Sequence, residues 1–188
     1  MRPARFQVLP QAMKVDAAID LIIPDNTAFT VLTALRQLGY EELTRVERSE
    51  HVILTVADTA RPDDVVQQLA RAEVLFNPNK HRMAYSVEEA APAAQPPEFE
   101  ARVRDADEDT SRLCALLTAT FGMTSLRGVE RAVGWRLYET SGPAPREQLE
   151  WACRELLANT VSQRYDIRPR PVRVQVREPG GLAAKEHR

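Results

Sequence analysis

The stretch Val46-Glu47-Arg48 recurs as Val129-Glu130-Arg131, 83 positions later in the chain. Matching residues surround the two copies in the same order: Gly39 and Leu43 correspond to Gly122 and Leu126, and Leu75, Asn77 and Arg82 correspond to Leu157, Asn159 and Arg164 at an offset of 82. Several in-order matches at nearly one offset predict that one α/β unit is duplicated. The repeat is too long for a solenoid and suits a small domain.

The composition indicates a protein with packed cores and no bulk attraction to polyanions. Hydrophobic residues make up 44% of the 188 positions, charged residues 28%, and the net charge is −2. No apolar run reaches the roughly 18–20 residues that cross a bilayer. Arg2 and Arg5 are not followed by an apolar segment and cleavage site, so we expect no signal peptide and a cytoplasmic location. We expect Cys114 and Cys153 to be thiols on helix faces, with neither a disulfide nor a metal site.

The first predicted unit covers residues 15–88, after a loose lead-in at 1–14. Alternation predicts strands at 17–23, 43–48, 51–57 and 83–87, with a turn at Ser49-Glu50, and helical stripes predict helices at 29–38 and 65–72. Asp25 is of a helix N-cap type, and Gly39 suits the position that ends the first helix. The resulting order is β-α-β-β-α-β.

The second predicted unit, residues 98–177, repeats that order after an Ala/Pro linker at 89–97. We expect strands at 99–103, 126–131, 133–139 and from 165, with helices over 113–121 and 149–157. Alternation from Val172 to Val176 predicts an extra edge strand, and residues 178–188 are expected to be a disordered tail.

A β-α-β-β-α-β unit is α+β with ferredoxin-like architecture, in which two helices cover one face of a four-stranded sheet. The other face of a lone unit is an exposed apolar surface. Two such units in one chain can cover each other, so the sequence predicts a pseudo-dimer formed within one chain.

Each unit resembles PurS, the small subunit of bacterial phosphoribosylformylglycinamidine synthase. The match rests on Trp151-Ala152-Cys153-Arg154-Glu155-Leu156-Leu157-Ala158-Asn159 followed by Tyr165-Asp166-Ile167, on Leu75-Phe76-Asn77-Pro78, and on Leu38-Gly39-Tyr40 with Val46-Glu47-Arg48 and Val52-Ile53-Leu54. Ile23-Pro24-Asp25-Asn26 and Ala106-Asp107-Glu108-Asp109 stand where PurS has a stretch rich in Asp-Pro and Gly.

The resemblance implies a subunit without catalysis or cofactor of its own in de novo purine biosynthesis. PurS pairs as a dimer and bridges the synthetase (PurL-like) and glutaminase (PurQ-like) subunits, supporting ammonia transfer between them. A tandem chain would be such a dimer made covalent, and further self-association stays open. The candidate partner-interface residues are Asn77, Arg82, Asn159 and Arg164, although Asn is common in turns and Arg at solvated strand edges.

Two other classes of function stay open. A ligand-sensing regulatory pair of ferredoxin-like units would bind a small molecule at the interface of the units, although no Gly-rich ligand loop is present. An RNA-binding protein would use the basic strip formed by Arg164, Arg168, Arg170, Arg173 and Arg177. The scattered histidines His51, His81 and His187 indicate no catalytic group, and Glu47 and Glu130 are interpreted as exposed charges at strand ends.

Overall fold

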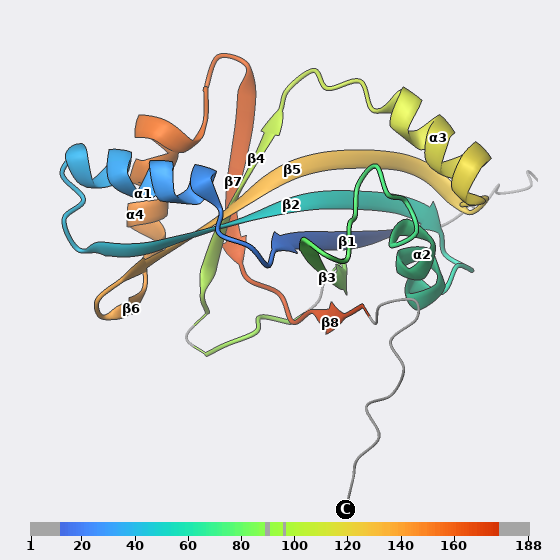
Figure 1. The fold of residues 1–188 in the computed structure, drawn as a ribbon, viewed down its shortest axis with the longest axis horizontal. Coiled ribbons are helices and arrows are strands. Elements are labelled where there is room, and N and C mark those ends of the chain that lie inside the picture. Colours follow the sequence, from blue (N-terminus) through green and yellow to red (C-terminus); the bar gives the residue numbers. More distant parts are fainter. Residues whose placement is uncertain (1–11, 89–90, 96, 177–188) are drawn as a thin grey trace, which may run out of the picture.

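A computed structural model describes residues 12–88, 91–95 and 97–176. The described chain is α+β: one antiparallel sheet of eight strands is combined with four α-helices (Figure 1). No helix in these ranges is long and apolar enough to cross a membrane.

The first part of the chain has three strands and two helices, and the second part repeats this order with additions. The elements of the first part are β1 (Ala12–Leu21), α1 (Asn26–Gln37), β2 (Leu43–Ala57), α2 (Pro62–Leu69) and β3 (His81–Val87). Those of the second part are β4 (Phe99–Asp105), α3 (Ser111–Phe121), β5 (Leu126–Glu139), β6 (Gly142–Pro143), α4 (Arg146–Ala152) continued by a π-helical turn η1 (Cys153–Leu157), β7 (Gln163–Pro169) and β8 (Val174–Gln175).

Local signals fix the start of α1 and the ends of α1 and α3, as the sequence predicts. Asp25 is the N-cap of α1, because its Oδ1 accepts hydrogen bonds from the backbone N–H groups of Thr27 (2.9 Å) and Ala28 (3.1 Å). Gly39 follows α1 with a φ of 107°, and Gly122 ends α3 with a φ of 69°. Both conformations lie in the left-handed region, where glycine has no steric penalty.

The predicted turn at Ser49-Glu50 is wrong, because β2 runs unbroken from Leu43 to Ala57. The predicted division of the second long strand at residue 132 is wrong for the same reason: β5 spans Leu126–Glu139. Ser49-Glu50 and Ala132 both lie in the middle of a strand that is paired on both sides of them, so neither position interrupts its strand. Strand β1 also begins earlier than predicted, at Ala12, within the expected lead-in.

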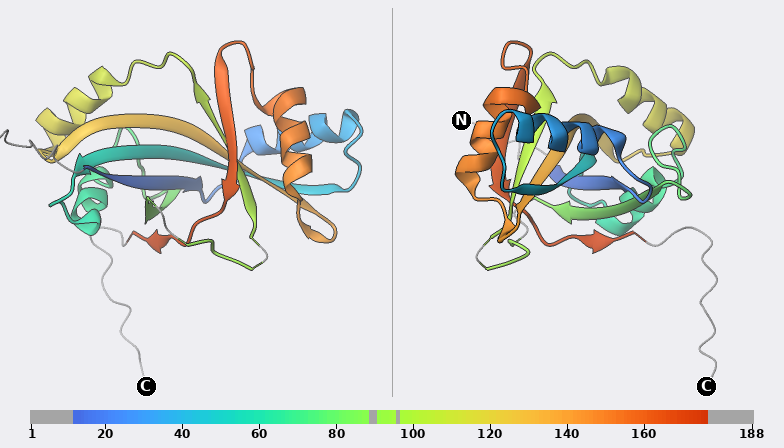
Figure 2. Two further views of the ribbon diagram at one scale, coloured as in Figure 1. Left: turned by 180° about the vertical axis from the view of Figure 1, so that it is seen from behind. Right: turned by 60° about the vertical axis from the view of Figure 1, so that its left-hand side comes forward.

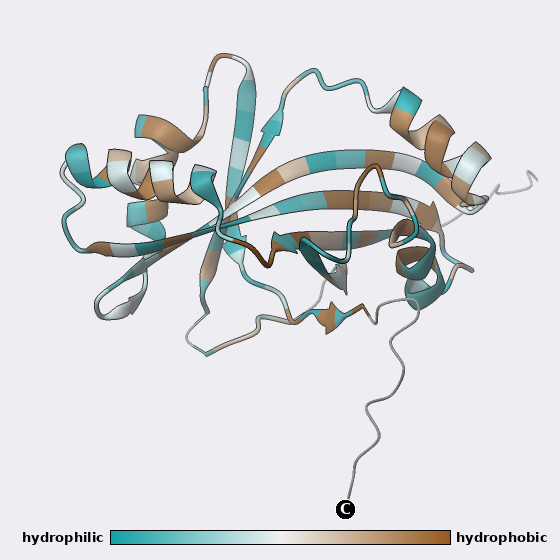
Figure 3. Cartoon of the chain, viewed as in Figure 1, coloured by the Kyte–Doolittle hydropathy of each residue, from teal (hydrophilic) through white to brown (hydrophobic). Residues whose placement is uncertain are grey.

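The sheet has the order β7-β4-β5-β2-β1-β3-β8, so the two long strands lie next to each other at its centre (Figure 1). Their register is the same for both copies of the repeat: Val46 lies opposite Leu137, and its counterpart Val129 lies opposite Leu54, which corresponds to Leu137. The pairing turns about the Glu50–Val133 pair, two positions that correspond in the repeat. The middle of β2 is hydrophilic, whereas its C-terminal part is hydrophobic (Figure 3).

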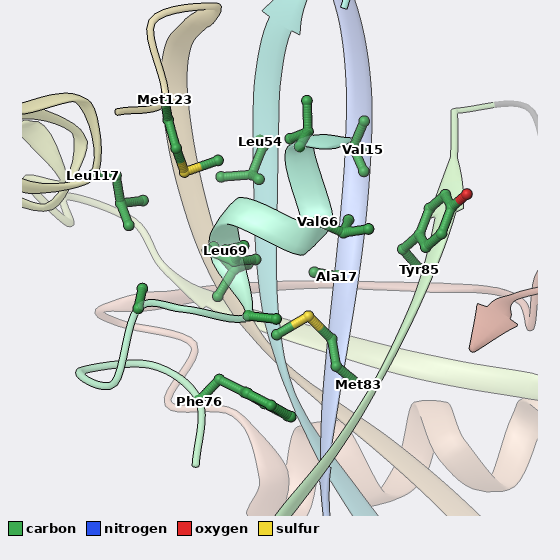
Figure 4. Packing of buried hydrophobic residues seen from close by; sticks show 14 of the residues in the cluster. Val15, Ala17, Leu54, Val66, Leu69, Phe76, Met83, Tyr85, Leu117 and Met123 are labelled. Atoms are coloured by element: carbon green, nitrogen blue, oxygen red, sulfur yellow. The ribbon is translucent and has the colours of Figure 1, made fainter. Parts of the chain in front are cut away.

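Both hydrophobic cores lie on one face of the sheet, and each contains residues from both parts of the chain. In the first, β1, β2, β3 and α2 pack against Leu117 and Met123 from the region of α3 (Figure 4). In the second, Leu35 of α1 and Val46 of β2 pack with β4, β5, β7, α4 and η1. Because each core needs both parts of the chain, separating the parts would expose both cores to water.

Residues 91–95 and the segment between β7 and β8 cross the other face together, below the sheet in Figures 1 and 2. Ala93 N–H donates to the carbonyl of Arg170 (2.8 Å), and Pro92 forms a β-bridge with Pro171. Strand β8 then pairs with β3, which confirms the predicted extra edge strand, here at the edge of the first part. The expected tail at 178–188 lies outside the described residues.

Candidate functional site

Charged side chains are buried on the sheet face opposite the helices. Successive residues of a strand point to opposite faces, so the residues that alternate with the apolar core residues gather on this face. They are Asp16 of β1, His51 of β2, Glu100 and Arg102 of β4, Arg136 of β5, and Arg173 just before β8. We call this set the buried charge cluster.

Glu100 is the centre of the buried charge cluster, and its side chain has no exposed surface. Its carboxylate accepts hydrogen bonds from Arg102 Nε (3.0 Å), Arg136 Nη1 (3.1 Å) and Arg173 Nη2 (3.0 and 3.1 Å). Arg136 also reaches Asp20 and Glu47 on the first part of the chain. Three guanidinium groups thus converge on one buried carboxylate and join both parts of the chain with the C-terminal segment.

His51 lies between the two buried carboxylates. Its Nδ1 is 2.8 Å from Asp16 Oδ1, and its Nε2 is 3.4 Å from Glu100 Oε1. A Cβ atom at Gly134 would lie 2.5 Å from His51 Nε2 and 3.2 Å from Glu100 Cδ. Glycine at 134, the position that corresponds to His51 in the repeat, therefore provides the space that the imidazole occupies.

The surrounding positive charges keep both buried carboxylates ionised. Burial alone would raise the pKa of Glu100, but His51 and the three arginines lower it well below its usual range. Burial likewise opposes ionisation of Asp16, but its hydrogen bond to His51 and its electrostatic interactions with His51, Arg102 and Arg173 lower its pKa. Ionisation of these carboxylates therefore stabilises the fold at neutral pH.

The buried charge cluster is suited to holding the two parts together rather than to catalysis. The side chain of His51 has no exposed surface and that of Asp16 is 11% exposed, so the imidazole of the Asp16–His51 pair is shielded from solvent. Among the described residues, no group of three or more His, Cys, Asp or Glu side chains could hold a metal ion.

The cysteines Cys114 and Cys153 are free thiols. Burial, and to a smaller extent the negative charge of Glu150, raises the pKa of Cys153 to about 12.

The predicted residues Asn77 and Asn159 form equivalent turns before β3 and β7. Asn77 Oδ1 accepts a hydrogen bond from the backbone of Asn79 (2.9 Å), and Asn159 Oδ1 accepts one from Val161 (3.1 Å). Each asparagine also accepts at its backbone carbonyl from the residue four positions on, His81 or Gln163. Both side chains therefore shape a loop, as Asx turns do.

Arg82 and Arg164 occupy corresponding places but have different surroundings. Arg82 is exposed on β3 and lines a cavity of about 430 Å³ together with Arg136 and Arg170. Arg164 lies on β7, at the end of the strand order, and donates to the carbonyls of Thr160 and Gln163. The four predicted interface residues thus lie in two separate places, one asparagine and one arginine in each part of the chain.

The arginines of the basic strip expected near the C-terminus mostly have carboxylate partners. Arg173 is bound to Glu100, Arg170 pairs with Glu98 (3.1 Å), and Arg168 pairs with Asp166. Three of the five arginines of the strip are thus bound to carboxylates within the chain. The last member, at position 177, lies outside the described residues.

The interpretation of Glu47 and Glu130 as strand-end charges is wrong, since both lie inside the long strands. Glu47 accepts from Arg136 Nε (3.1 Å), and Glu130 accepts from Lys14 Nζ (2.9 Å). Sequence reasoning also missed the buried charge cluster. The available signal was the placement of charged residues such as Asp16 and Glu100 at positions that alternate with apolar residues in the strands.

No protein-family model matches this chain, and a search of curated proteins finds no similar sequence.

Proposed function

We propose that this chain is a PurS-like subunit of phosphoribosylformylglycinamidine synthase, built from two fused PurS-like halves. In this proposal residues 15–88 and 98–177 form a pseudo-dimer, and the chain bridges a synthetase subunit and a glutaminase subunit in the cytoplasm. It has no active site of its own and acts through the surface that the two halves present.

One observation carries the proposal: the register of β2 against β5. The two long strands pair symmetrically about the Glu50–Val133 pair. Val46 lies opposite Leu137, and in the same way its counterpart Val129 lies opposite Leu54, the counterpart of Leu137. Two identical subunits related by a two-fold axis pair in this way. The shared cores support the same interpretation, because helix α1 of one half packs with α4 and η1 of the other.

The chemistry of the described residues supports a binding role over catalysis. The best-organised polar groups are buried and paired within the buried charge cluster, where they join the halves. The residues proposed to face partners are Asn77 and Arg82 in the first half and Asn159 and Arg164 in the second. Their different surroundings give the two halves different surfaces, as contact with two different subunits requires.

Co-purification tests this proposal. The tagged chain is mixed with the synthetase and glutaminase subunits from the same organism, with glutamine, ATP and magnesium present. We expect a ternary complex, weakened at least several-fold by Arg82→Ala and unaffected by Arg36→Ala, which removes an exposed arginine from α1. Recovery of neither enzyme subunit with the wild-type chain would exclude the bridging role.

A further inference from the structure

Two cavities lie side by side on the face of the sheet that carries the helices. On this face α1 and α4 lie at one end, and α2 and α3 lie at the other (Figure 1). Their volumes are about 250 and 240 Å³, and both are lined by Arg48, Glu50 and Arg131. We call the larger the β5 cavity, because Trp135 and Val133 of β5 line it, and the smaller the β2 cavity, because Val52 of β2 lines it. Both are slightly below the range of about 300–1,000 Å³ that holds drug-sized ligands.

The two cavities are lined by positions that correspond in the repeat. At an offset of 83 or 82 the matching pairs are Asp25 with Glu108, Arg48 with Arg131, Glu50 with Val133, Val52 with Trp135, Leu75 with Leu157, and His81 with Gln163. The same structural positions thus form a cavity twice. The correspondence follows the two-fold relation of β2 and β5, in which Glu50 lies opposite Val133.

The charges at the shared wall are arranged in opposite pairs. Arg48 is held tightly, with Nη1 2.8 Å from Glu50 and Nε 3.2 Å from Asp25. Arg131 is held loosely: its nearest carboxylate contacts are Glu108 at 3.5 Å and Glu50 at 3.7 Å, and 46% of its side chain is exposed. The guanidinium of Arg131 therefore retains donors that can bind another carboxylate in a bidentate manner.

The β5 cavity also offers carboxylates and an apolar wall. Glu50 and Glu108 lie beside Arg131, with side chains 41% and 28% exposed. Val103, Val133, Trp135 and Leu157 supply the apolar part of the lining. Three arginines and three acidic residues line the cavity in all, the remaining ones being Arg48, Arg104 and Asp105. This balance opposes a polyanion such as a nucleotide and suits a ligand that carries both charges.

We propose that the β5 cavity binds a free α-amino acid with an apolar side chain. Its carboxylate is bound by Arg131, its ammonium group by Glu50 and Glu108, and its side chain lies against Trp135. The proposal is independent of the bridging role, since it concerns the isolated chain.

The two tryptophans of the chain make the site directly observable. Trp135 lines the β5 cavity, whereas Trp151 packs against Tyr40 beside a different cavity. The protein is labelled with 5-fluorotryptophan, the two ¹⁹F signals are assigned with Trp151→Phe, and L-leucine and L-phenylalanine are titrated to millimolar concentrations. We expect a saturable shift of the Trp135 signal and an unchanged Trp151 signal.

Single-charge analogues and two arginine variants complete the test. We expect 4-methylpentanoate and 3-methylbutylamine, which lack one charge each, to bind at least about tenfold more weakly than L-leucine, and Arg131→Ala to weaken L-leucine by about tenfold. Arg112→Ala, an exposed arginine on α3, leaves binding unchanged. No shift with either amino acid, analogues that bind as tightly as L-leucine, or a response of Trp151 instead would overturn the proposal.

Discussion

Replacement of Glu100 by glutamine tests the buried charge cluster most severely. The change keeps the size of the side chain but removes the only charge that three guanidinium groups share, at distances of 3.0–3.1 Å. Glutamine also directs an NH₂ donor toward groups that only donate. Removal of one partner from a buried ionic group costs about 3–5 kcal/mol, because the remaining charges stay buried without compensation.

Urea denaturation followed by circular dichroism at pH 7 measures this loss. We expect Glu100→Gln to lower the free energy of unfolding by about 3–5 kcal/mol. The control is Glu98→Gln, which breaks the partly exposed pair with Arg170 and is expected to cost less than about 1 kcal/mol. A cost for Glu100→Gln as small as that of the control would refute the view that the cluster holds the halves together.

Three further predictions concern the same structure. Gly134→Ala places a Cβ 2.5 Å from His51 Nε2 and should lower the free energy of unfolding, measured by urea denaturation, by about 1–3 kcal/mol. The control Gly128→Ala, whose Cβ would lie 3.8 Å from its nearest neighbour, should lower it by less than about 1 kcal/mol. In the His51→Ala background, Gly134→Ala should have little further effect, and an undiminished loss there would contradict the clash. The two buried carboxylates have lowered pKa values, so their stabilisation is complete above the unfolded pKa of about 4 and is lost as the pH falls below it; a flat stability between pH 5 and pH 2 would contradict this. Cys153 should react with a thiol reagent far more slowly than the partly exposed Cys114 at pH 8, because it is buried and its pKa is raised; equal rates would contradict its burial.

Local patterns predicted most of the elements correctly. The helical stripes before Gly39 and Gly122 correspond to α1 and α3, and the alternation after Val172 corresponds to β8. These features depend on residues close in sequence, namely caps, glycines and periodic apolar side chains. The Asn77 and Asn159 turns belong to the same class.

The long strands and the buried charge cluster could not be predicted from local patterns. The Ser49-Glu50 pair has the composition of a turn, yet Ser49 lies opposite Gly134 and Glu50 opposite Val133 in the continuous strand. That pairing joins residues more than 80 positions apart, so no local window contains its cause. The charges at positions 16 and 100 are tolerated for the same reason, since their partners come from distant strands.

The central claim is that the chain couples a glutaminase to an ATP-dependent synthetase. Its most direct test is the rate of phosphoribosylformylglycinamidine synthesis by the two purified enzyme subunits, measured as this chain is added. We expect glutamine-dependent synthesis to rise and saturate as the chain is added, while synthesis from free ammonia changes little. A glutamine-dependent rate that is the same with and without the chain would contradict it.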